Sequence, residues 1–71
     1  MTVLSQRIKE LRIANNLLQQ SLADSLGLSL RGYQRYERGE RKPDSDTLIA
    51  LADYFGVSLD YLVGRSDEPK L

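Results

Sequence analysis

The central part of the chain reads QQSLADSLGLSLRGYQRYERG, from residue 19 to residue 39. Leu22 and Leu26 stand at helical spacing, and Gly27 follows them with the freedom to take the left-handed conformation that ends a helix. Ser29 then offers its hydroxyl as the cap of another helix, which Gly39 ends. The stretch therefore predicts two short helices separated by a three-residue turn that contains glycine.

The sequence on either side predicts three more helices and no strand. Apolar residues repeat at helical spacing from Leu4 to Leu11, and Asp44 and Ser58 stand as N-caps before the last two apolar stripes. The predicted helices are residues 5–14, 19–26, 30–38, 45–55 and 59–63. They form one all-α domain of residues 1–66, followed by a frayed tail at residues 67–71.

The composition restricts the chemistry. A chain of 71 residues has room for one domain, and with no Cys and no His it has no disulfide, no zinc site of the Cys/His type and no base that titrates near neutrality. We expect no catalytic residue, no metal and no cofactor, and therefore no enzyme. No long apolar run or secretory leader is present, so we expect a cytoplasmic protein without a membrane partner.

The formal net charge of zero conceals an asymmetry. Residues 1–42 carry eight basic and four acidic side chains, whereas residues 43–71 carry two basic and six acidic ones. The first part is positive by four charges and the second is negative by four. Such a split is typical of a protein with one face that meets phosphates, although a random spread of surface charge is the alternative.

The helix at residues 30–38 has two chemically different faces. Tyr33 and Tyr36 would point toward the preceding helix, while the opposite face presents Leu30, Arg31, Gln34, Arg35 and Arg38. Arginine can donate two hydrogen bonds to guanine, glutamine can pair with adenine, and an apolar side chain can contact the methyl group of thymine. The outer face therefore has the side chains needed to read bases in a major groove.

The order of residues across this stretch resembles the phage-repressor and Cro type of helix-turn-helix regulator, the Xre-like family. The similarity rests on Gln19, Leu22-Ala23, Leu26-Gly27, Ser29 and Arg35-Tyr36-Glu37, and it continues into RIKELR at 7–12 and TLIALADYFGVSLDYL at 47–62. It implies a compact five-helix, lambda-repressor-like domain that places residues 29–38 in the major groove of double-stranded DNA.

The resemblance also implies roles for individual residues. The base readers would be Leu30, Arg31, Gln34 and Arg35. Arg12 and Glu37 match an ion pair that joins the first helix to the recognition helix, and we expect it to be mainly structural. Contacts with the DNA backbone are expected from Gln19, Ser29, Arg38, Arg41 and Lys42.

Leu18, Gly32 and Tyr33 depart from the family pattern, and Leu30 is an unusual base reader. Leu18, on the apolar stripe of the second helix, stands where a polar N-cap is usual, so Asn16 could instead cap an earlier start. Gly32 weakens the recognition helix, or lets its backbone approach DNA closely. Tyr33 takes a position that is usually aliphatic, and its hydroxyl must find a partner or reach water. Leu30 offers no hydrogen bond to a base.

These features predict a sequence-specific transcriptional regulator that acts as a repressor and binds paired half-sites as a homodimer. No small-molecule effector is evident. Candidates for the dimer surface are Val57, Leu59, Tyr61 and Val63, while Leu62 is expected in the core. The alternative is a helix-turn-helix domain kept for contact with a protein, as in an antitoxin or anti-repressor module, with little DNA binding.

Overall fold

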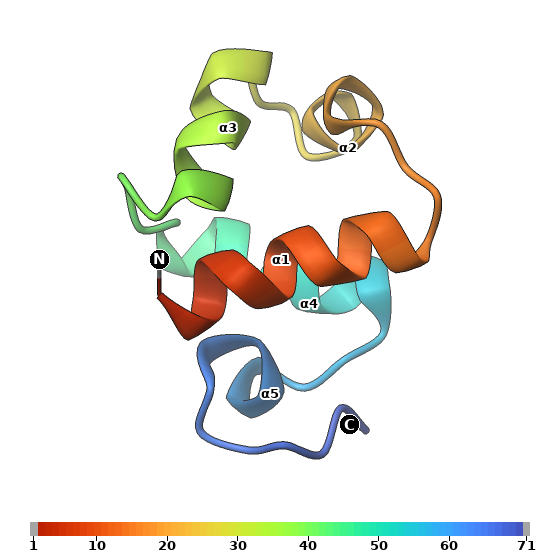
Figure 1. The fold of residues 1–71 in the computed structure, drawn as a ribbon, viewed down its shortest axis with the longest axis vertical. Helices are drawn as coiled ribbons and strands as arrows, with labels where there is room; N and C mark the ends of the chain where they lie inside the picture. Colours follow the sequence, from red (N-terminus) through yellow and green to blue (C-terminus); the bar gives the residue numbers. More distant parts are fainter. Residues whose placement is uncertain (1, 71) are drawn as a thin grey trace.

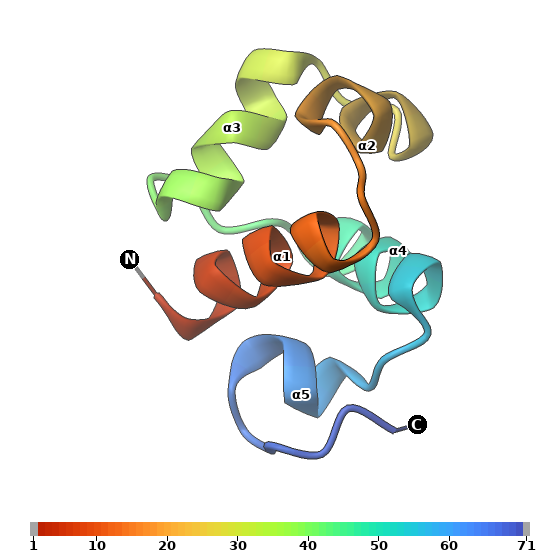
Figure 2. The ribbon, with the colours of Figure 1, turned by 45° about the vertical axis from the view of Figure 1, so that its right-hand side comes forward.

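Helix α1 (Val3–Ala14) runs through the middle of the molecule in the computed structural model, which describes residues 2–70. Helices α2 (Gln19–Ser25) and α3 (Leu30–Arg38) lie on one side of it, and α5 (Leu59–Val63) lies on the other (Figure 1). Helix α4 (Ser45–Phe55) lies behind α1 in Figure 1, and the turned view in Figure 2 shows it next to the C-terminal part of α1. The described residues contain no strand, and the prediction of an all-α fold with five helices is confirmed.

Each helix contributes one large, fully buried apolar side chain to a single core. These residues, all with an exposed fraction of 0%, are Ile8, Leu22, Tyr33, Leu51 and Leu62. Burial of such a side chain contributes about 1.5–3 kcal/mol. Because α2 and α5 are too short to be stable alone, they depend on this shared core for their helical structure.

Three predicted N-caps are present. Ser29 accepts a hydrogen bond from the amide of Gly32 at 3.0 Å, and Asp44 accepts one from Thr47 at 2.8 Å. Ser58 caps α5 in the same way, with 3.0 Å to the amide of Tyr61. A cap of this kind is worth about 1 kcal/mol, which fixes where α3, α4 and α5 begin.

Helix α1 begins earlier than the apolar spacing predicts. The side chain of Thr2 accepts a hydrogen bond from the amide of Ser5 at 3.1 Å, and the hydroxyl of Ser5 accepts one from the amide of Thr2 at 3.0 Å. This reciprocal pair satisfies two amides at the helix start, so Val3 and Leu4 belong to α1.

The start of α2 lacks a side-chain cap. Leu18 occupies the N-cap position without a capping hydrogen bond and is 72% exposed, so the prediction that it joins the apolar stripe is wrong. It precedes the first helical residue and has an extended backbone, which turns its side chain away from the core. Asn16 does not cap an earlier start, because it has a left-handed backbone with φ of 56°.

Arg7 of α1 joins α5 and the segment that follows it. Its guanidinium lies 4.1 Å from the ring centroid of Tyr61 and donates hydrogen bonds to the carbonyls of Tyr61 and Ser66. It also pairs with Asp67 at 2.9 Å. Further on, the carbonyl of Pro69 accepts from the amide of Ser58 at 3.0 Å. Fraying of residues 67–71 stays a prediction, and Leu71 lies outside the described residues.

Candidate nucleic-acid interface

The turn between α2 and α3 sets the orientation of the candidate recognition helix. Gly27 follows α2 with φ of 69°, a conformation that glycine takes without steric cost. The amide of Leu28 then donates to the carbonyl of Ala23 at 2.9 Å, which ties the turn back onto α2. Helix α3 consequently leaves the turn at a steep angle to α2, as Figure 1 shows.

Helix α3 has the two faces that its sequence predicts. Tyr33, Tyr36 and Glu37 are buried, with exposed fractions of 0%, 6% and 4%. Arg31 and Arg35 are exposed on the other side, while the predicted readers Leu30 and Gln34 are half-buried. The arginine-bearing side of α3 therefore points away from the core.

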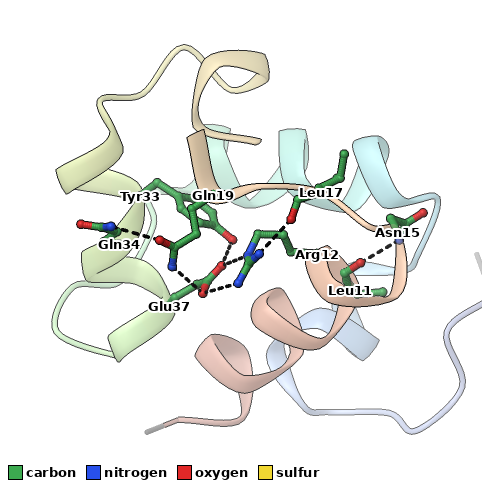
Figure 3. Close-up of polar contacts among 8 residues, drawn as sticks. All are labelled: Leu11, Arg12, Asn15, Leu17, Gln19, Tyr33, Gln34 and Glu37. Atoms are coloured by element: carbon green, nitrogen blue, oxygen red, sulfur yellow. Dashed lines mark hydrogen bonds and ion pairs between the residues drawn. The ribbon is translucent and has the colours of Figure 1, made fainter. Parts of the chain in front are cut away.

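The predicted pair of Arg12 and Glu37 joins α1 to α3 on the inner side. Nε of Arg12 lies 2.6 Å from Oε2 of Glu37, and Nη2 lies 3.3 Å from Oε1 (Figure 3). Arg12 also donates a hydrogen bond to the carbonyl of Leu17 at 2.8 Å, which connects α1 to the loop before α2. Both side chains are largely buried, which agrees with a structural role for the pair.

The carboxylate of Glu37 receives two further hydrogen bonds. The hydroxyl of Tyr33 donates to Oε2, and Nε2 of Gln19 donates to Oε1 at 3.1 Å. Burial alone would raise the pKa of Glu37, but the donors Arg12, Tyr33 and Gln19 together lower it below its ordinary value. Burial, followed by the bond to Glu37, raises the pKa of Tyr33. Glu37 is thus an ionised, fully paired carboxylate next to the core.

The sequence did not predict how Gln19 and Gln34 interact. Nε2 of Gln34 donates to Oε1 of Gln19 at 3.0 Å (Figure 3). A residue predicted to read a base is thus bonded to a residue predicted to contact the DNA backbone. The amide of Gln19 therefore lies between Glu37 and Gln34. Nothing in the local sequence pattern signals this contact, because the two residues are fifteen positions apart on different helices.

Two open hollows bring the other predicted residues together. One, of about 430 Å³, is lined by Ser29, Arg31, Gly32, Arg35 and Arg41. Arg41 therefore lies beside the proposed readers and not on a separate flank. Within residues 2–70, these three arginines form no ion pair.

The second hollow, of about 460 Å³, lies on the other side of α3 and is lined by Lys9, Arg12, Gln19, Glu37 and Arg38. Lys9 is a cation that the sequence reasoning missed, although it precedes Arg12 by three residues on the same face of α1. Arg38 is exposed and lies 3.9 Å from Glu40. This hollow has three cations against one paired carboxylate, which suits an anion.

Lys42 lies apart from both hollows. It lines an apolar depression with Thr2, Val3, Leu4, Pro43, Leu48 and Val63. The described residues hold no group of three or more acidic, His or Cys side chains suited to a metal ion. Across residues 2–70, no helix has the length and apolar character needed to cross a bilayer.

A small all-α domain with two helices in this turn geometry and an exposed, basic second helix is a helix-turn-helix protein. A family model described as helix-turn-helix matches residues 8–62, and the chain belongs to this family. The predicted resemblance and fold class are therefore confirmed. Because proteins of this family are non-enzymatic transcriptional regulators, the expectation that the chain is not an enzyme is also confirmed.

Curated relatives carry names that agree with this family. The chain is 39% identical over 64 residues to the uncharacterized HTH-type transcriptional regulator YobD of Bacillus subtilis, covering 90% of this chain and 57% of YobD. It is 39% identical over 62 residues to the cryptic phage CTXphi transcriptional repressor RstR of Vibrio cholerae, covering 87% of this chain and 55% of RstR. The chain thus spans about half the length of these relatives.

A solved structure extends the comparison to a complex with DNA. The P22 c2 repressor, crystallised with a synthetic operator, superposes with a TM-score of 0.83 at 27% identity. The match covers 93% of this chain and 100% of that one.

Proposed function

We propose that this chain is the DNA-binding domain of a transcriptional repressor, with α3 in the major groove of its operator. The observation that carries the proposal is the outward face of α3, where Arg31 and Arg35 are exposed and form no ion pair within residues 2–70. The inner face of the helix is fixed to α1 by the Arg12 and Glu37 pair. Arg31 and Arg35 would read guanine, Gln34 adenine, and Leu30 the methyl group of thymine. A rigid helix presents such readers at a fixed register, which sequence-specific binding needs.

Phosphate contacts would come from residues that line the two hollows. Ser29 and Arg41 border one, and Gln19 and Arg38 border the other. Lys9 joins this set, because it lines the second hollow together with Arg38. Lys42 remains a proposed contact, since its exposed ammonium follows Arg41 directly and has a long flexible stem.

The proposed assembly is a homodimer on paired half-sites about one helical turn apart, because one short helix reads few base pairs. Leu59 and Val63 of α5 are 43% and 37% exposed, and they support a protomer contact there. Val57 belongs to the core at 5% exposure, so it is removed from the proposed surface. A repressor must be in the same compartment as its operator DNA, and we propose that this chain is located in the cytoplasm.

A salt titration of binding to duplex DNA tests the proposal. If each protomer of a dimer neutralises about three phosphates, the logarithm of affinity should fall against the logarithm of salt concentration with a slope on the order of five. Selection from a random duplex pool should then enrich two related half-sites. If the chain binds no duplex even at low salt concentration, the result would instead support the alternative, a domain that contacts a protein.

A further inference from the structure

Two glutamine amides lie in series between a buried carboxylate and the outer face of α3. Nε2 of Gln19 donates to Oε1 of Glu37 at 3.1 Å, and Nε2 of Gln34 donates to Oε1 of Gln19 at 3.0 Å. Figure 3 shows this chain running from the buried pair toward the side chain of Gln34. The proposed reader Gln34 is thus hydrogen-bonded before any ligand arrives.

The chemistry of Glu37 fixes the direction of both amides. An ionised carboxylate has acceptors only, so Gln19 must turn its NH₂ group toward Glu37 and its carbonyl oxygen toward Gln34. That oxygen can meet only a donor, so Gln34 must turn its own NH₂ group inward. Rotating either amide by half a turn would bring two oxygens together and leave an acceptor unpaired near the core.

This direction determines what Gln34 can offer to a base. One of its two N–H groups is used by Gln19, which leaves its carbonyl oxygen as an acceptor and its second N–H as a donor. Adenine presents the complementary pair in the major groove, a donor at N6 and an acceptor at N7. An unanchored amide can present this pair in either order, whereas the anchored amide presents it in one.

We propose that Gln19 is a positioning residue that gives Gln34 its preference for adenine, through an amide orientation imposed by Glu37. The inference rests on the proposed function, and it assigns Gln19 a part in specificity beyond its expected contact with the DNA backbone. It predicts that loss of Gln19 and loss of Gln34 have the same effect at one base pair. A double variant should then lose no more adenine preference than Gln34→Ala alone.

The adjacent glutamine supplies a matched control. Gln20 also stands in the first turn of α2, but it is exposed and bonds to Asp24 within the same helix at 2.8 Å. Within residues 2–70 its side chain forms no hydrogen bond with α3, because its amide bonds to a residue of α2. Gln20→Ala therefore removes a glutamine amide from the same helix start without touching Gln34.

The experiment selects bound sequences from a random duplex pool with the wild-type chain and then measures competition between duplexes that differ at one base pair. Gln34→Ala identifies that pair as the one whose adenine preference disappears. There the wild type should favour adenine by about tenfold, as for one bidentate contact. Gln19→Ala should abolish most of this preference and leave the other positions unchanged, while Gln20→Ala keeps it.

The ratio between two duplexes is measured on one preparation, so a smaller folded fraction does not alter it. Gln19→Met, which keeps the volume of the side chain, provides a second variant. If Gln19→Ala or Gln19→Met weakens every sequence equally and retains the adenine preference, the inference is wrong and Gln19 contacts only the backbone. It is also wrong if Gln34→Ala changes no position. A wild-type chain that selects no sequence overturns the proposed function as well.

Discussion

The hydroxyl of Tyr33 donates a hydrogen bond to the carboxylate of Glu37, four residues further along α3. Tyr33 is fully buried, so this bond satisfies the one polar atom that its ring brings into the core. The same carboxylate accepts from Arg12 of α1 and Gln19 of α2. Glu37 therefore connects three helices, and the geometry of the reading face depends on it.

Replacing Glu37 by Ala should lower the free energy of unfolding by about 3 kcal/mol, because Arg12 would remain in place as a largely buried charge without its partner. Urea denaturation followed by circular dichroism measures this change. Glu40→Ala is the matched control, since Glu40 is 54% exposed and pairs only loosely with Arg38 at 3.9 Å. Its effect should stay under about 1 kcal/mol. Equal effects of the two variants would contradict a central role for Glu37.

The stability of the protein should fall in acid partly because of Glu37. Its pKa in the folded state lies below the ordinary value of 4.5, so the unfolded chain takes up the proton more readily. The stabilisation is therefore present above about pH 4.5 and is lost as the pH falls through the folded pKa. Unfolding curves recorded from neutral pH downward should show this slope.

Glu37→Gln should make that acid slope shallower. Some slope remains, because a hydrogen bond from the backbone of Thr47 also lowers the pKa of Asp44. Asp44→Asn is the complementary variant, since asparagine is as good an N-cap without the charge. An unchanged slope in Glu37→Gln would show that Glu37 has the same proton affinity in the folded and unfolded chains.

Arg7 should hold the segment after α5 through its bonds to backbone carbonyls more than through its ion pair. Arg7→Ala removes charged donors from the carbonyls of Tyr61 and Ser66 and should cost about 2 kcal/mol. Asp67→Ala should change nothing measurable, because the Asp67 side chain is fully exposed. Hydrogen exchange at the amide of Ser58, which bonds to Pro69, tests whether the tail is frayed. A rapidly exchanging Ser58 amide in the wild type would support fraying.

Local signals in the sequence were enough to predict the five helices and three of their N-caps. Ser29, Asp44 and Ser58 each bond to an amide three residues away, so residue type and spacing identify them. The reciprocal cap of Thr2 and Ser5 is equally local, and the apolar spacing alone did not reveal it. The error at Leu18 arose because helical spacing was extended to a residue that precedes the first helical residue and has an extended backbone.

The contacts around the reading face were harder to predict because they join residues far apart in the chain. Arg12 and Glu37 were found only through a family resemblance. The pairing of Gln19 with Gln34 depends on the angle between α2 and α3 and on the direction that Glu37 imposes. The spacing of Lys9 and Arg12 in the sequence could have predicted that they share a face of α1. That Lys9 lines a hollow with Arg38 follows only from the packing of α1 against α3.

Arg31→Ala should separate base reading from folding. Arg31 is exposed at the start of α3, so its loss should change the free energy of unfolding by less than about 0.5 kcal/mol. Binding to the selected site should weaken by about 1–3 kcal/mol, with little change on random duplex. Fluorescence anisotropy with both duplexes at one salt concentration measures the difference. An equal loss on both would make Arg31 a contact to phosphate.

Gly32→Ala tests why a glycine stands inside the reading helix. Its new methyl group would lie 3.1 Å from Oγ of Ser29, the atom that caps α3, so some of the cap is lost. Alanine gains about 1 kcal/mol of helix propensity, and a disturbed cap costs about the same. We therefore expect a nearly unchanged stability in thermal unfolding.

The same methyl group would enter the hollow that Arg31, Arg35 and Arg41 surround. If DNA approaches the backbone of α3 there, Gly32→Ala should weaken binding to the selected site at least tenfold, roughly the cost of one lost specific contact. The variant leaves every arginine in place, so electrostatic attraction cannot account for such a loss. Unchanged affinity together with a higher melting temperature would mean that Gly32 only loosens the free helix and that DNA does not reach its backbone.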